Sequence, residues 1–243
     1  MAVPSKSCAL AREPLYLQVC ELLTQRIAGG VWQPNAALPN EVDLARELGV
    51  SSGTVRKALE RLETDRVVVR RQGRGTFVVD QAAPEAVSRF DRLRQADGNP
   101  IAWRIKLIEW NAGEPTPPEQ KALQIGPGEP VVRRRRLVST PSRPFAVEEA
   151  CLAIGRLPGL GADEVGDWCV TAVAQRHGVH VARASEEVRP VAASQETAQL
   201  LAIAPGTALL RLDRVIWSMD HAPIEWRSLS CHLRDEYYLA EVA

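Results

Sequence analysis

Residues 51–63 read SSGTVRKALERLE, and this stretch decides how the first part of the chain is interpreted. Apolar residues recur at i, i+3, i+4 and i+7, which predicts an amphipathic helix running to about Asp65 with one buried stripe. These apolar residues are Val55, Ala58, Leu59 and Leu62. Ser51 is a favourable N-cap, and the turn after it combines small hydrogen-bonding residues with Arg56 and Lys57. A helix that only packs against a core does not need such a front, so a partner for its N-terminus is expected.

The partner that this helix end fits best is a nucleic acid. Backbone N–H groups at a helix N-terminus attract phosphate, hydroxyl groups bind phosphate oxygens, and arginine can bind guanine with two hydrogen bonds. The recognition helix of a helix-turn-helix uses its N-terminal residues in this way. The alternative is a solvated amphipathic helix with a serine cap, and the flanking sequence bears on that choice.

The flanking segments predict two earlier helices and a later β-hairpin. Apolar periodicity predicts a helix from Pro14 to about Gly29 and a short helix within residues 40–50 that ends at Gly49. Residues 67–79, VVVRRQGRGTFVV, predict a hairpin that turns over Gln-Gly-Arg-Gly. The predicted order is therefore helix, helix, turn, helix, hairpin.

Positive charge gathers on the third helix and the hairpin. Four arginines and no acid lie between residues 66 and 75, namely Arg66, Arg70, Arg71 and Arg74. The Gly-Arg-Gly tip would hold Arg74 on a projecting turn, where a minor groove or a phosphate could receive it. The whole chain has zero net charge, and residues 12–79 carry ten Lys and Arg against eight Asp and Glu. Because the charge is local, a DNA-binding face and salt-sensitive binding are expected.

Residues 14–79 resemble the winged helix-turn-helix of GntR-type bacterial transcription regulators. The motifs that carry the resemblance are PLYLQV (14–19), IAGG (27–30), LPNEVDLARELGVSSGTVRKALERLE (38–63) and RRQGRGTFVV (70–79). The resemblance implies that double-stranded DNA is contacted by Asn40, Glu41, Ser51, Ser52, Thr54, Arg56, Lys57, Arg74 and Gly75. Three departures affect the operator sequence. Val42 and Ser52 stand where family members often have arginine, and Arg66 stands where they usually have glycine.

The rest of the chain contains an internal repeat. LQIGPGEPVVRRRRLV (123–138) matches LAIAPGTALLRLDRVI (201–216) at an offset of 78 residues. The repeat predicts two similar helix–turn–strand–hairpin units in an α+β domain, an antiparallel sheet with helices on one side. A ligand is expected at the seam between the two copies. The predicted organisation is a flexible tail (1–13), a winged helix-turn-helix domain (14–79), a linker (80–87) and an effector-binding domain (88–243).

Residues 88–243 resemble the UTRA effector domain of the HutC subfamily, whose fold is similar to chorismate lyase. The resemblance is carried by RRLVSTPSRPFAVEEACL (135–152), WCVTAVAQRHGV (168–179) and DHAPIEWRSLSCHLRDEYYL (220–239). It implies a small-molecule effector pocket lined by Arg136, Glu148, Trp168, Glu186, Glu225, Trp226 and Tyr237. Val138 replaces a second pocket arginine of the family.

The run of four arginines at 133–136 is interpreted as part of a strand. Alternation then places Arg134 and Arg136 on one face and Arg133 and Arg135 on the other. The pocket is interpreted as one arginine, two or three acids and an aromatic wall, which suits a zwitterion or an amine-bearing carboxylate better than a sugar phosphate. The alternatives are a strand with solvated charges and tryptophans that belong to the core.

Other features of the sequence bear on location and on catalysis. The five cysteines are scattered without a CxxC pair, which predicts reduced thiols in the cytoplasm. No signal peptide and no membrane-spanning segment are predicted. His177 and His180 are a weak metal signal, and neither a metal nor a cofactor is expected. The sequence shows no GxSxG, Walker or dinucleotide-binding motif, so the chain is not expected to be an enzyme.

These features predict a cytoplasmic, ligand-responsive transcription repressor. It would bind a palindromic operator as a homodimer, with one recognition helix in each major groove, and a small metabolite would release it. One alternative is a chorismate-lyase-like enzyme tethered to a DNA-binding domain. Another is a nonspecific architectural DNA binder, against which the zero net charge and the ligand-type second domain argue.

Overall fold

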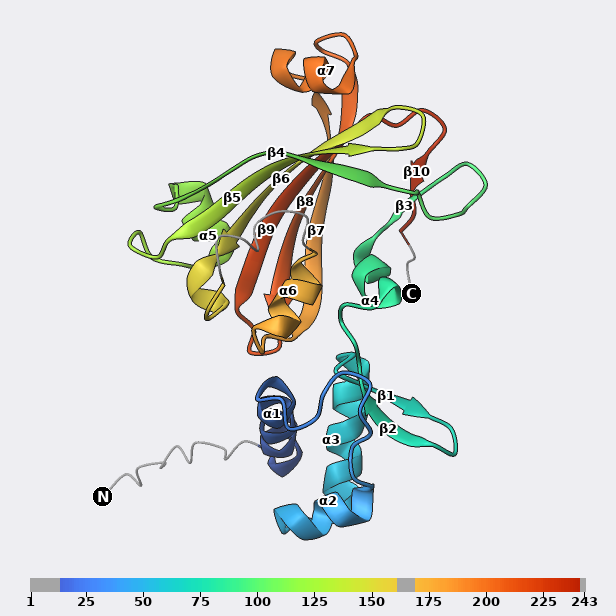
Figure 1. The fold of residues 1–243 in the computed structure, drawn as a ribbon, viewed down its shortest axis with the longest axis vertical. Coiled ribbons are helices and arrows are strands. Elements are labelled where there is room, and N and C mark those ends of the chain that lie inside the picture. Colours follow the sequence, from blue (N-terminus) through green and yellow to red (C-terminus); the bar gives the residue numbers. More distant parts are fainter. Residues whose placement is uncertain (1–13, 161–168, 241–243) are drawn as a thin grey trace, which may run out of the picture. The chain divides into compact units, whose positions relative to one another are not determined.

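The computed structural model describes residues 14–160 and 169–240. The predicted flexible tail (1–13) and Trp168 lie outside this described part. The chain divides into two compact units, one up to Val79 and one from Asp80 onward, and both are drawn in Figure 1. Among the described residues, no helix is both long enough and apolar enough to cross a membrane.

The first unit has the predicted three helices and hairpin. Its elements are α1 (Leu15–Ala28), α2 (Glu41–Leu48), α3 (Ser52–Thr64), β1 (Val68–Arg71) and β2 (Gly75–Val78). The Asn40 side chain caps α2 at its start, and Gly49 ends it in the left-handed conformation at φ 64°. The four apolar residues of the α3 stripe are all buried, as their spacing predicts, and α3 packs against both α1 and α2. Tertiary packing of amphipathic faces therefore stabilises this unit.

The hairpin joins the helices through backbone hydrogen bonds. Strands β1 and β2 pair from Val68 opposite Val78 to Arg71 opposite Gly75. Leu38 N–H donates to the Thr76 carbonyl at 2.9 Å, which adds the loop before α2 to the edge of the hairpin. The β2 edge of the hairpin, which we call the wing, is thus fixed along its length, and Figure 1 shows its tip extending away from the helices.

The second unit is built on a six-stranded antiparallel sheet in the order β4-β5-β6-β9-β8-β7. The strands are β4 (Arg104–Gly113), β5 (Val131–Ser139), β6 (Pro144–Ala153), β7 (Val181–Ala192), β8 (Ala208–Ser218) and β9 (Pro223–Cys231). The helices are α4 (Pro84–Val87), α5 (Pro117–Leu123), α6 (Val170–Arg176) and α7 (Gln195–Leu201), with 3₁₀ turns η1 (Ser88–Phe90) and η2 (Ile154–Arg156). A small separate pair joins β3 (Leu93–Arg94) to β10 (Tyr237–Tyr238).

The predicted repeat is visible in this topology. The order β4-α5-β5-β6 recurs as β7-α7-β8-β9, and an offset of 78 residues carries α5 onto α7. The two copies meet where β6 pairs with β9 at the centre of the sheet. Both helices end on a non-glycine residue in the left-handed conformation, Gln124 at φ 51° and Ala202 at φ 53°. In each copy the next residue closes the same bond, from Ile125 N–H to Gln120 O and from Ile203 N–H to Ala198 O.

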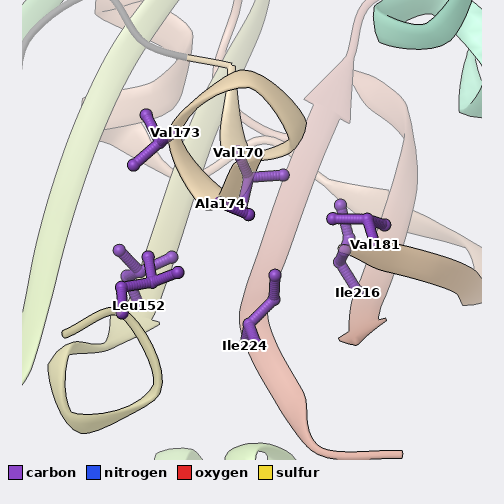
Figure 2. Packing of buried hydrophobic residues seen from close by; sticks show 8 residues of the cluster. Leu152, Val170, Val173, Ala174, Val181, Ile216 and Ile224 are labelled. Atoms are coloured by element: carbon purple, nitrogen blue, oxygen red, sulfur yellow. The ribbon is translucent and has the colours of Figure 1, made fainter. Parts of the chain in front are cut away.

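Helices lie on both faces of the sheet, which corrects the expectation that they lie on one side. Helices α5 and α7 cover the face that we call the helix face, where Leu123 packs with Cys151 and Ala198 packs with Val147. Helix α6 covers part of the opposite face, which we call the pocket face. Figure 2 shows Val170, Val173 and Ala174 of α6 with Leu152 and Ile216 of the sheet.

The segment interpreted as a linker, residues 80–87, packs within the second unit. The Gln81 side chain is fully buried and bonds the backbone of Val181 in both directions, donating to its carbonyl at 3.1 Å and accepting from its N–H at 3.0 Å. Helix α4 occupies the last four residues of the segment. The chain that follows the wing is therefore attached to the start of β7.

Candidate nucleic-acid interface and ligand pocket

The front of α3 is small, exposed and polar. Ser51 Oγ accepts from Thr54 N–H at 3.1 Å and lies 2.9 Å from Thr54 Oγ1. A Cβ added at Gly53 would meet only Ser51 Oγ within 4 Å, at 3.7 Å, so the backbone there faces open space. The first turn of α3 can therefore approach a phosphate closely with its N–H groups.

Glu41 connects the start of α2, the second turn of α3 and the wing. Its carboxylate accepts from Arg56 Nε at 2.9 Å and from Arg70 Nη2 at 3.4 Å. Arg70 also donates to the Arg56 carbonyl at 3.4 Å, and its N–H donates to Glu63 Oε1 at 3.1 Å. This network ties strand β1 to the front half of α3, so the hairpin and the helix front belong to one surface.

Two further predicted DNA contacts, Asn40 and Lys57, also have partners within the protein. Asn40 Oδ1 accepts from the N–H groups of Val42 and Asp43 at 3.1 and 2.9 Å, and its amide nitrogen donates to the Asp43 carboxylate at 2.7 Å. The Lys57 ammonium lies 4.1 Å from the centre of the Tyr16 ring, which directs it back towards α1.

Two other predicted contacts lie on the hairpin turn. Arg74 is exposed, and its backbone N–H donates to the Arg71 carbonyl at 2.9 Å, which closes the turn. Gly75 has φ 110°, a conformation that residues other than glycine rarely adopt. The turn therefore places Arg74, an exposed residue, at the end of the wing.

The second unit has a pocket of about 200 Å³ on the pocket face of the sheet. Its walls are largely apolar and include Leu93, Trp103, Ile105, Leu212 and Leu229. Its charged lining residues are Asp91, Arg92, Arg136, Glu148, Glu186, Arg214 and Arg227. A cavity with apolar walls and a few convergent charged groups is the usual form of a small-molecule site.

Glu148 is the centre of one buried ionic cluster. It lies 2.6 Å from Arg136 Nη2, 3.3 Å from Arg227 Nη1 and 3.5 Å from Arg134 Nη2. Burial would raise the pKa of Glu148, but Arg227, Arg134 and Arg136 together hold it below its ordinary value. Glu225 lies beneath them, fully buried and 3.3 Å from Arg134 Nη2. The floor of the pocket is thus an ionised network.

A second cluster stands beside it. Arg214 Nε donates to Glu186 at 2.7 Å and Arg214 Nη2 donates to the Phe90 carbonyl at 2.6 Å. Tyr238 donates its hydroxyl to the other Glu186 oxygen at 2.7 Å. Burial and this bond to a carboxylate raise the pKa of Tyr238 to about 12, so the hydroxyl stays protonated. Glu186 is therefore held between two fixed donors.

The structure brings some predicted effector residues together and separates others. Arg136, Glu148 and Glu186 line the pocket, and Glu225 lies under its floor. Trp226 is on the helix face, where it lines a different cavity of about 250 Å³. Tyr237 is 39% exposed and pairs with Arg94 in the small sheet, while its neighbour Tyr238 reaches Glu186.

The interpretation of a pocket with a single arginine is wrong. Arg92, Arg214 and Arg227 line it as well as Arg136. Arg214 is the repeat equivalent of Arg136, 78 residues later, and the repeat could have identified it. The aromatic lining comes from Phe90 and Trp103, which precede the repeat and gave no signal of their own in the sequence.

A winged helix-turn-helix unit and a sheet unit with a charged pocket, in one chain, define a ligand-binding transcription regulator. The comparison with family models agrees with this class. Residues 15–78 match the bacterial regulatory proteins of the gntR family, and residues 102–237 match the UTRA domain. The chain belongs to the GntR family and carries a UTRA domain, the combination of HutC-type members.

Similar proteins are also regulators. The transcriptional repressor NagR of Bacillus subtilis is 28% identical over 232 residues, 92% of each chain. The probable fructoselysine utilization operon repressor of Escherichia coli is 28% identical over 223 residues, 89% of this chain and 90% of that one. A solved ligand-binding domain of a GntR-family regulator from Bordetella bronchiseptica is 26% identical with a TM-score of 0.58, covering 64% of this chain and 98% of that one. The family regulates transcription and is not a family of enzymes, so the enzyme alternative is set aside.

Proposed function

We propose that the chain is a repressor that binds a palindromic operator as a homodimer in the cytoplasm and leaves it when a small molecule fills the pocket. The similar proteins from Bacillus subtilis and Escherichia coli are named as repressors, which supports this direction of control. The observation that carries the proposal is the joint surface of the α3 front and the wing, tied together through Arg70.

In this proposal, the residues of the surface have two roles. Ser51, Ser52, Thr54 and Arg56 enter the major groove, and Arg74 with Gly75 at the wing tip reaches a minor groove or a phosphate. Asn40 and Glu41 act mainly by position, because Asn40 caps α2 and Glu41 orients Arg56 and Arg70. Lys57 contributes charge from the side of the helix.

A mobility-shift assay with DNA from the region upstream of the gene tests operator binding. We expect a shift at low salt that weakens steeply as salt rises, because phosphate contacts release counterions. Arg74→Ala should weaken binding on all sequences, whereas Lys121→Ala, which removes an exposed charge from α5, should not. Absence of any shift at low salt would refute the proposal.

A homodimer explains the palindromic operator, because a two-fold protein matches a two-fold site. Light scattering on the full chain measures the oligomeric state directly. A monomer at micromolar concentration that still binds a palindrome with full affinity would contradict this part of the proposal.

We propose that the effector carries an acid group and an amine. Arginines and acids line the pocket together, so ligand groups of either sign would find a partner there. A similar protein from Escherichia coli is named as the probable repressor of a fructoselysine utilization operon. Fructoselysine carries both an amine and a carboxylate, which supports the same ligand class here. Calorimetry with ligand panels tests the class, and tight binding of a sugar phosphate without an amine would overturn it.

A further inference from the structure

Asp91 differs from the other acids of the pocket. Glu148 and Glu186 are each held by arginines at 2.6 to 2.7 Å. Within residues 14–160 and 169–240, no ion pair or side-chain hydrogen bond engages the Asp91 carboxylate, although its backbone N–H donates to Ser88 and its carbonyl accepts from Arg94. The backbone at Asp91 is thus fixed while the carboxylate is uncommitted.

The neighbouring arginines are already directed elsewhere. Arg214 donates to Glu186 and to the Phe90 carbonyl, and Arg227 faces Glu148 and Glu225. Burial raises the pKa of Asp91, and the more distant charges of Arg227, Arg214 and Arg94 only partly oppose this. A half-buried carboxylate without a direct partner is a costly group, and a cation placed beside it would lower that cost.

We infer that Asp91 selects the effector by pairing with a positively charged amine of the ligand. The inference rests on the proposed function, because it assigns a role within the effector pocket. The apolar walls at Trp103, Leu212 and Leu229 would hold the carbon skeleton, and the arginine side of the pocket would hold the acid group. A ligand with acid groups alone would meet repulsion from Asp91, so the residue discriminates against it.

Calorimetry on the full chain with matched probes tests this role. The probes are the L-amino acids and linear ω-amino acids, each compared with the carboxylic acid that lacks its amine. We expect at least one amine-bearing probe to bind, and its deaminated partner to bind about tenfold more weakly or worse. Asp91→Asn should weaken the amine-bearing probe by about 10- to 100-fold and leave the deaminated partner unchanged or tighter.

The controls separate this inference from the proposed function. Asp220→Asn makes the same chemical change at an exposed residue outside the pocket and should leave binding unaltered. An unchanged unfolding midpoint shows that Asp91→Asn still folds. If no amine-bearing probe binds, or if Asp91→Asn weakens both members of a pair equally, the inference is overturned. A mobility-shift assay on the same samples then shows whether the chain still binds its operator, so that failure of this inference can be told from failure of the proposed function.

Discussion

The arginines of one strand, β5, have different environments on the two faces of the six-stranded sheet. Residues 133–136 of β5 are four consecutive arginines, and alternate members point to opposite faces. On the pocket face, Arg134 and Arg136 meet Glu148, whose side chain is 5% exposed. On the helix face, Arg135 meets Glu196 of α7, whose side chain is 67% exposed. The same residue type in one strand therefore pairs with a buried acid on one face and, at Arg135, with solvent-exposed acids on the other.

The difference shows that burial, rather than the number of ion pairs, decides what such a network does. Exposed pairs contribute little to stability because water competes with them. Buried pairs cost desolvation and stabilise only when every charge keeps its partners. On the pocket face, the buried ion pairs line a cavity, where their charged groups can bind a ligand. The helix face uses its pairs to attach α5 and α7.

The largest loss of stability is expected from Glu148→Gln. The change removes the anion that Arg134, Arg136 and Arg227 share, so the free energy of unfolding should fall by about 3 to 5 kcal/mol. Urea denaturation measures it. If the free energy of unfolding falls no more than for an exposed ion pair, the two faces do not differ in the way described here.

A smaller loss is expected from Glu119→Gln on the helix face. Glu119 accepts from Arg133 at 2.6 Å and from the N–H of Thr116 at 2.7 Å, which closes the capping box of α5. The Glu119 carboxylate is buried, but its partner Arg133 is 26% exposed and can be solvated when the pair is lost, so we expect about 1 to 2 kcal/mol in the same urea titration. A loss matching that of Glu148→Gln would mean that both faces behave as buried.

The loss of stability at acid pH should also depend on Glu119. Burial raises the pKa of Glu119, but bonds from Arg133 and Thr116 outweigh this and lower it from 4.5 to about 2. Because the folded value is depressed, the stabilisation is complete above about pH 4.5 and is lost as the pH falls towards 2. Unfolding midpoints between pH 5 and pH 2 should therefore decline less in Glu119→Gln than in the unaltered chain. Parallel curves would contradict the assignment.

The smallest effect is expected from Glu196→Gln. Arg135 keeps Glu149 at 3.4 Å and Glu109 at 3.9 Å, and all three acids are largely exposed. The unfolding midpoint in urea should not change beyond experimental error. A clear loss here would show that α7 depends on this one pair.

The first unit could be predicted from sequence because its signals are local. The Ser51 cap, the α3 stripe and the Gly-Arg-Gly turn each lie within a few residues, and the structure confirms all three. In the second unit, the repeat and the alternation along β5 were equally readable and were also confirmed.

The residues that line the pocket were harder to predict from the sequence. Glu225 and Trp226 are neighbours in β9, so alternation forbids both from facing one cavity, and they were nevertheless both assigned to it. Asp91 and Trp103 reach the pocket from a segment that precedes the repeat and folds over the sheet. No local sequence pattern predicts that a segment so far along the chain from these strands will pack against them.

The matching turns at Gln124 and Ala202 show that the two halves of the second unit share backbone geometry as well as sequence. Each residue holds a left-handed conformation that glycine adopts more easily, yet the two copies agree in torsion angle and in the hydrogen bond that follows. The side chains on the two halves differ in chemistry, as Glu129 and Thr207 show. The bend of the main chain is the same in both, and the strand that follows it in each half takes its direction from that bend.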